Sequence, residues 1–128
     1  MDAIRTEGLD HVALTVSELG RSRDFYANVL GLEQAYEEWH EPVFMLGSGS
    51  GLALFTRESH PVDGAGDGER EIRLLHIAFR VGREEFDRAR AELPKLAIEV
   101  HFSDHGICHS IYFADPDGHQ LELTTYEL

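Results

Sequence analysis

An internal repeat constrains the fold of this chain more than any other feature. Residues 9–16 read Leu-Asp-His-Val-Ala-Leu-Thr-Val and residues 74–81 read Leu-Leu-His-Ile-Ala-Phe-Arg-Val. Both segments alternate apolar and polar residues, which is typical of half-buried β-strands. Each is followed by a segment with apolar residues at helical spacing and then by three further strand candidates. The chain is therefore predicted to contain a βαβββ module twice.

The remaining elements are predicted from turn residues and from alternation. The strand candidates of the first module are residues 33–39, 43–46 and 51–56, and those of the second are residues 98–102, 110–114 and 119–125. Residues 57–71 are rich in glycine and acidic residues, as a linker is. A chain of 128 residues suits one compact domain. We therefore expect a single α+β domain over residues 1–128, with module one at about 8–56 and module two at about 72–126.

Composition excludes several classes of partner. The formal net charge of −13 repels nucleic acid and anionic membrane surfaces. The single cysteine, Cys108, has no second cysteine to pair with, and no apolar run approaches membrane-spanning length. Met1 is not followed by an apolar signal region. We therefore expect a cytoplasmic protein that binds neither nucleic acid nor a membrane.

The alternation also places three polar residues on one face of the predicted sheet. Glu122 lies between two leucines in residues 119–125, so it points from the opposite face. His11 and His76 likewise lie opposite the apolar side chains of their strands. Two imidazoles and one carboxylate on one face form a triad that suits Fe(II), while Mn(II) and Zn(II) could occupy it too. The alternative is that they are three unrelated residues on a solvated face.

Several segments together carry a resemblance to the vicinal oxygen chelate superfamily, also called the glyoxalase, bleomycin-resistance and dioxygenase superfamily. The matching segments are residues 9–16, 22–32, 75–79 and 112–122. The resemblance implies paired βαβββ modules that form a curved mixed sheet around a divalent metal. It also implies a small-molecule substrate with vicinal oxygens and a homodimer, and it places the metal ligands at His11, His76 and Glu122.

Three subgroups of this superfamily remain as alternatives. Glyoxalase I enzymes use a fourth ligand, a glutamate at the position of Ala53. Fosfomycin-resistance transferases use three ligands, but they carry a threonine where this chain has Ala13, and late basic residues where it has none after Lys95. Bleomycin-type binding proteins generally sequester the drug without a metal triad. Each departure counts against the subgroup concerned.

The closing segment resembles type I extradiol dioxygenases in most positions of their signature. The matching residues are His105, Tyr112, Asp115, Pro116, Gly118 and Glu122, and Ser103 departs from it. By this resemblance His105 would donate a hydrogen bond to substrate or bound oxygen, and Tyr112 would orient a catecholate oxygen. We therefore expect an Fe(II)-dependent extradiol-type dioxygenase acting on a catechol-like substrate. The alternatives are a non-redox metal-dependent lyase or isomerase, and an antibiotic-resistance or ligand-binding protein.

Other polar residues have less defined roles. His60 is the nearby candidate for the additional acid/base histidine of the dioxygenases, but it lies in the predicted linker. Cys108 and His109 match no standard metal cluster. Arg80 shares a face with His76, so it either meets an anionic substrate group or pairs with an acidic residue.

Overall fold

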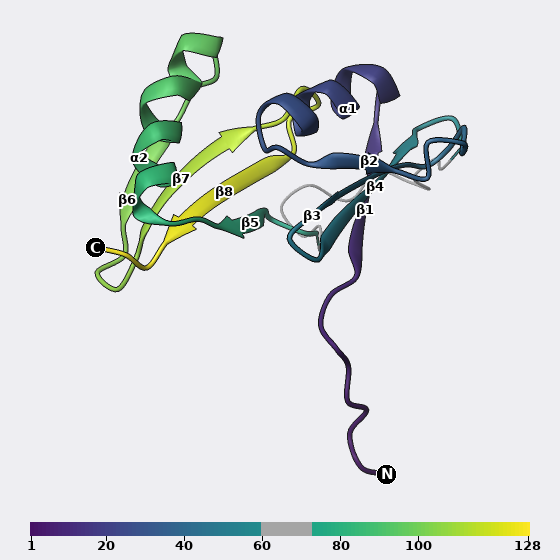
Figure 1. Cartoon of the computed structure of the whole chain (residues 1–128), viewed down its shortest axis with the longest axis horizontal. Coiled ribbons are helices and arrows are strands. Elements are labelled where there is room, and N and C mark those ends of the chain that lie inside the picture. The colour runs from purple at the N-terminus through teal and green to yellow at the C-terminus, as the bar shows by residue number, and fades with distance from the viewer. Residues whose placement is uncertain (60–72) are drawn as a thin grey trace. The chain divides into compact units, whose positions relative to one another are not determined.

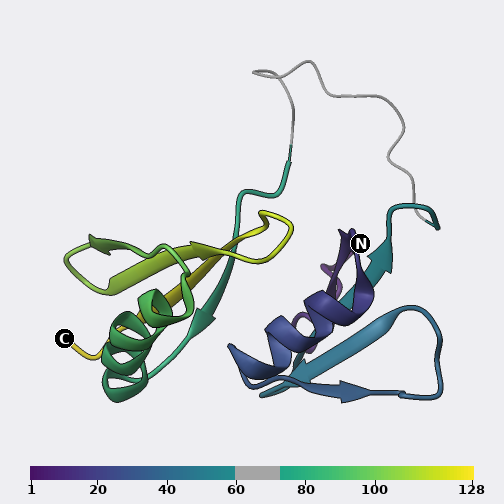
Figure 2. The same cartoon turned by 90° about the horizontal axis from the view of Figure 1, so that it is seen from above.

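The structure is a computed structural model that describes residues 1–59 and 73–128 (Figures 1 and 2). The chain divides into two compact units, an N-terminal unit at Met1–Ala65 and a C-terminal unit at Gly66–Leu128. Within the described residues, each unit has one α-helix and one four-stranded sheet. The predicted single-domain organisation stays a prediction. His60 and most of the predicted linker lie outside the described residues.

The N-terminal unit follows the predicted βαβββ order. Its elements are β1 (His11–Val16), α1 (Leu19–Asn28), β2 (Glu33–Ala35), β3 (Val43–Gly47) and β4 (Ser50–Thr56). The sheet order is β1-β4-β3-β2, with β1 parallel to β4 and the other pairs antiparallel. The buried core includes Tyr26 of α1 and Val16, Met45 and Leu54 of the sheet. The alternating apolar residues of β1 thus form the core, as their pattern predicts.

The C-terminal unit repeats this arrangement. Its elements are β5 (Ile77–Arg80), α2 (Arg83–Glu92), the 3-10 helix η2 (Leu93–Leu96), β6 (His101–Asp104), β7 (His109–Ala114) and β8 (Gln120–Thr125). The sheet order is β5-β8-β7-β6, and β5 is parallel to β8. Phe86 of α2 is fully buried, together with Ile111 and Leu121 of the sheet. Within the residues that the structure describes, no helix is long and apolar enough to span a membrane.

Strand register confirms the repeat. In the N-terminal unit Ala13, two residues after His11, pairs with Ala53. In the C-terminal unit Ala78, two residues after His76, pairs with Glu122. The two histidines are therefore structurally equivalent, and the carboxylate occurs in only one of two equivalent positions. The predicted α+β fold of two βαβββ modules is confirmed.

Three strand boundaries differ from the prediction by three or four residues, and a residue with positive φ explains two of these differences. β2 ends at Ala35 instead of residue 39, because Tyr36 has φ +54° and its carbonyl accepts the Trp39 N–H in a turn. β6 begins at His101 instead of residue 98, because Ala97 has φ +61° and closes η2. β5 begins only at Ile77, and the two leucines before His76 are exposed.

The hairpin between β7 and β8 forms at the predicted turn. The Asp115 carboxylate accepts hydrogen bonds from the backbone N–H groups of Asp117 and His119, each at 2.9 Å. Gly118 has φ +89°, a conformation that glycine adopts without strain. This turn aligns β7 with β8 so that Tyr112 lies directly opposite Glu122.

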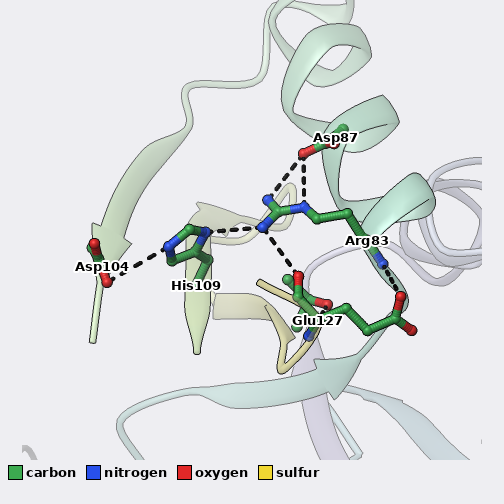
Figure 3. Close-up of polar contacts among 6 residues, drawn as sticks. Arg83, Asp87, Asp104, His109 and Glu127 are labelled. Atoms are coloured by element: carbon green, nitrogen blue, oxygen red, sulfur yellow. Dashed lines mark hydrogen bonds and ion pairs between the residues drawn. The ribbon is translucent and has the colours of Figure 1, made fainter. Parts of the chain in front are cut away.

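A polar network anchors α2 to the sheet (Figure 3). The guanidinium of Arg83 donates to Asp87 at 2.9 Å and contacts His109 Nδ1 at 3.0 Å. Because a guanidinium only donates, His109 Nδ1 is the acceptor. His109 Nε2 lies 3.6 Å from Asp104, so both ring nitrogens face partners on the helix side of the sheet. His109 is therefore a structural residue, and the neighbouring Cys108 is a buried free thiol.

Candidate metal centre

Two of the three predicted metal ligands face one another in the C-terminal unit. His76 immediately precedes β5, and Glu122 lies in the adjacent strand β8. His76 Nε2 and Glu122 Oε1 are 3.0 Å apart. Two donor atoms that bind one ion at about 2.1 Å and at right angles lie about 3 Å apart. The pair therefore fits the requirements of a divalent metal in both donor chemistry and spacing.

Ser110 holds the second oxygen of Glu122. Glu122 is 8% exposed, and Ser110 of β7 is fully buried. The Ser110 hydroxyl donates to Glu122 Oε2 at 2.6 Å. One carboxylate oxygen is thus fixed while the other faces His76, an arrangement that orients metal ligands. The sequence indicates only that Ser110 shares a face with Tyr112, so this contact was missed.

Replacing Ser110 with alanine is expected to weaken metal binding by roughly 10–100-fold, the usual cost of losing a partner that orients a ligand. The measurement is calorimetric titration with Mn(II). Ser103→Ala is the matched control, because Ser103 is the register partner of Ser110 in the neighbouring strand β6. Equal affinities for the two variants would contradict the role of Ser110.

Tyr112 and His105 lie beside this pair. The rings of His76 and Tyr112 meet edge to face with centroids 5.8 Å apart. His105 Nε2 is 3.0 Å from the Tyr112 hydroxyl. Burial raises the pKa of Tyr112, and the negative charge of Glu122 raises it further. Tyr112 is therefore a protonated donor at neutral pH. With His76, Glu122 and His105, it makes four of the five predicted site residues that lie in this unit.

His11, the third predicted ligand, lies in the N-terminal unit. His11 Nδ1 is 2.7 Å from a carboxylate oxygen of Asp10, a contact that orients the ring and directs Nε2 elsewhere. Among the residues of known placement, no three His, Cys, Asp or Glu side chains form a metal-binding group. The complete triad of His11, His76 and Glu122 therefore stays a proposal.

A series of aromatic rings extends from His11 across the N-terminal sheet. Phe44 contacts His11 edge to face at 5.2 Å and Tyr36 at 5.7 Å. Tyr36 in turn stacks on Trp39 at 4.3 Å, and both rings are about half exposed. This group was missed, because Tyr36 and Trp39 were predicted to be strand residues. Its contact with His11 depends on the register that pairs Phe44 with Ala53, on the face of His11, and this register is known only from the structure.

Trp39 is the single tryptophan of the chain, so its fluorescence is expected to report metal binding at His11. Co(II), a paramagnetic ion, should quench it saturably, and His11→Ala should reduce the apparent affinity at least about tenfold. Fluorescence titration measures both. His40→Ala is the control, because His40 is an exposed histidine adjacent to Trp39. Quenching that depends on His40 and not on His11 would contradict the assignment.

Comparisons with known proteins cover most of this chain. A sequence model described as the Glyoxalase/Bleomycin resistance protein/Dioxygenase superfamily matches residues 8–123. The metallothiol transferase FosB of Lysinibacillus sphaericus is 30% identical over 122 residues, which cover 93% of this chain and 82% of that protein. The catechol-2,3-dioxygenase of Bacillus subtilis is 28% identical, but the match covers only 40% of its length against 90% of this chain.

A solved structure adds a bound metal to the comparison. It is a variant of the fosfomycin resistance protein FosX of Listeria monocytogenes, complexed with Mn(II) and 1S,2S-dihydroxypropylphosphonic acid. The two chains are 29% identical, with a TM-score of 0.70, and the match covers 93% of this chain and 90% of FosX. These relatives support the resistance-protein alternative better than ring cleavage, although Ala13 and the lack of late basic residues counted against it. The chain belongs to the Glyoxalase/Bleomycin resistance protein/Dioxygenase superfamily.

Proposed function

We propose that this chain is a divalent-metal-dependent enzyme that adds a nucleophile, a thiol or water, to a small molecule whose neighbouring oxygens bind the metal. His11, His76 and Glu122 would hold the ion, with Mn(II) in place of the Fe(II) expected from the dioxygenase resemblance. The observation that carries the proposal is the pair of donors His76 Nε2 and Glu122 Oε1 at 3.0 Å, with Ser110 holding the other carboxylate oxygen.

The donor set is compatible with a non-redox role. Two imidazoles and one carboxylate leave coordination positions for two substrate oxygens. A bound divalent ion supplies Lewis-acid chemistry, which stabilises negative charge on a substrate oxygen without electron transfer. Such chemistry accords with relatives named as thiol transferases and fosfomycin resistance proteins.

Tyr112 and His105 supply the proton chemistry of this proposal. The nucleophile forms a bond to a substrate carbon while the bond from that carbon to oxygen breaks, and the electron pair stays on the oxygen. Tyr112, protonated at neutral pH, donates a hydrogen bond to this oxygen and then its proton. His105, 3.0 Å from the Tyr112 hydroxyl, returns a proton to Tyr112. The proton lost by the nucleophile balances the one gained by the product.

The test is metal-dependent conversion of fosfomycin, a phosphonate that carries an epoxide ring. Protein loaded with Mn(II) is incubated with fosfomycin and either glutathione, cysteine or no thiol, and the products are followed by 31P nuclear magnetic resonance. We expect a new phosphonate signal that requires both metal and His76. If neither thiol nor water produces a metal-dependent product, the proposal fails for this substrate class.

Ring cleavage is the second candidate, and the contact between His105 and Tyr112 favours it, because both residues belong to the dioxygenase signature. Anaerobic loading with Fe(II), followed by a panel of catechols in air, tests it through the yellow ring-fission product and through oxygen consumption. Turnover in this assay, with none in the fosfomycin assay, would replace the first proposal with the second.

A further inference from the structure

The turn between β6 and β7 carries one residue of the proposed site in an exposed position. His105 lies in this turn, residues 105–108, and its side chain is exposed. Its Nε2 is nevertheless 3.0 Å from the Tyr112 hydroxyl, and the two rings meet edge to face with centroids 6.4 Å apart. Exposed turns are among the more mobile parts of a fold, so a side chain held there at hydrogen-bond distance needs support from the turn itself.

The side chain of Asp104 provides this support. Its Oδ1 accepts a hydrogen bond from the backbone N–H of Gly106 at 2.8 Å. An aspartate that accepts the N–H two residues further on fixes the backbone in a turn. Gly106 has φ +83°, which suits glycine, and the backbone N–H of His105 donates to the Cys108 carbonyl at 2.9 Å. The backbone of His105 is therefore fixed on both sides.

Asp104 is itself held from the opposite face of the sheet. It is the register partner of His109, whose Nε2 lies 3.6 Å from Asp104 Oδ1. His109 Nδ1 accepts from the guanidinium of Arg83, which belongs to α2 (Figure 3). Tyr112, in contrast, lies opposite Glu122 on the face of the candidate metal centre. The turn thus connects the polar network on the helix side with the site on the other face.

We propose that Asp104 is a positioning residue that holds His105 Nε2 against the Tyr112 hydroxyl. Asp104 acts through His105, whose proposed role is to return a proton to Tyr112. As a statement about catalysis this rests on the function proposed above, and it applies equally to ring cleavage, which uses the same two residues. The dependence of the contact between His105 and Tyr112 on Asp104 is testable without turnover.

Three substitutions separate the hydrogen bond of the turn from the charge of the carboxylate. Asp104→Asn keeps an acceptor oxygen at the same reach, Asp104→Glu keeps the charge but moves it by one methylene, and Asp104→Ala removes both. Nuclear magnetic resonance of the full chain follows hydrogen exchange of the Gly106 amide and the imidazole 15N signals of His105. In the alanine and glutamate variants we expect faster exchange and a shifted His105 Nε2 signal, whereas the asparagine variant should resemble the original chain.

An equal response of Asp104→Asn and Asp104→Ala would overturn the proposal, because the hydrogen bond to Gly106 would then not be the cause. If Asp104→Ala does not fold, the comparison of Asp104→Glu with Asp104→Asn carries the same test.

Kinetics test whether Asp104 acts through His105. Asp104→Ala should lower kcat by roughly 10–100-fold with little change in KM, because displacing a reacting group by about 1 Å costs up to about 100-fold. In a His105→Ala background the same substitution should cause no further loss, since the group that Asp104 positions is then missing. Equal losses in both backgrounds would show a general structural role and overturn the proposal.

Asp87→Ala is the matched control. The side chain of Asp87 is 62% exposed and that of Asp104 is 61% exposed, and both belong to the network around Arg83. Asp87, however, lies in α2 and pairs with Arg83. We expect unchanged kcat and unchanged His105 signals in this variant. Equal effects of Asp87→Ala and Asp104→Ala would contradict a specific role of Asp104 in the turn.

Failure of this inference can be told apart from failure of the proposed function. If fosfomycin is converted and Asp104→Ala changes neither kcat nor the His105 signals, Asp104 does not position His105 although the function holds. If Asp104→Ala shifts the His105 signals but neither fosfomycin nor a catechol is converted, the positioning role stands and the reaction is another.

Discussion

Glu122→Gln is expected to abolish stoichiometric metal binding while leaving the fold intact. Glutamine has the shape of glutamate, and its amide oxygen can still accept the hydrogen bond from Ser110. The variant nevertheless loses the charged oxygen that faces His76. Affinity for Mn(II) should fall by more than the roughly 10–100-fold that loss of an orienting partner costs. Elemental analysis of purified protein and calorimetric titration measure the loss.

The chain offers a matched control for this experiment. Glu99 contacts His101 at 3.3 Å, so it forms a second histidine–glutamate pair of similar length, but both side chains are exposed. Glu99→Gln should leave metal content unchanged. Retention of stoichiometric metal by Glu122→Gln, or equal losses in the two variants, would refute the assignment of Glu122.

Phe86→Ala is expected to lower the free energy of unfolding by about 3–5 kcal/mol, the usual cost of removing a buried phenylalanine side chain. Phe86 is 0% exposed and lies where α2 packs on the C-terminal sheet, near the rings of Phe102 and His109. Because a small domain has a total stability of only about 5–15 kcal/mol, the loss is a large share of it. Urea denaturation followed by circular dichroism measures the change.

Phe102→Ala is the control for this prediction. It distinguishes the loss of a buried core side chain from the loss of an aromatic ring in general on this side of the sheet. Phe102 contacts Phe86, but it is 40% exposed, so less apolar area is lost when it is truncated. We expect a clearly smaller loss of stability than for Phe86→Ala. Similar losses in both variants would show that the buried ring of Phe86 is not the main contact between α2 and its sheet.

Periodicity explains why most of the fold could be predicted. The alternation in residues 9–16 and 74–81 marks which side chains are buried, and the repeat requires the second half to pair as the first does. The errors occurred where a single backbone conformation ends an element. Neither the left-handed conformation of Tyr36 nor that of Ala97 follows from residue type, because non-glycine residues adopt positive φ only under tertiary constraint.

The candidate site was predictable where it depends on which face of a strand each side chain occupies. The alternation of side chains along the strands assigns His76, Tyr112 and Glu122 to one face, and strand pairing brings them together. The sequence did not predict that Ser110 holds Glu122. The two residues lie on different strands, and a carboxylate can accept its hydrogen bonds from a side-chain hydroxyl or from water. Nor did it decide between a carboxylate and Tyr126 as the partner of Arg80.

The sequence by itself determined the duplicated βαβββ scaffold, the face on which each polar residue lies, and the presence of a carboxylate, Glu122, in only one of the two equivalent last strands. These properties follow from periods of two and 3.6 residues, which depend on local geometry alone. The tertiary structure decided which polar groups meet: His76 with Glu122, Ser110 with Glu122, and Arg80 with Tyr126. Such contacts depend on strand register and on where the C-terminal segment is anchored, and both are set by packing between residues distant in the chain.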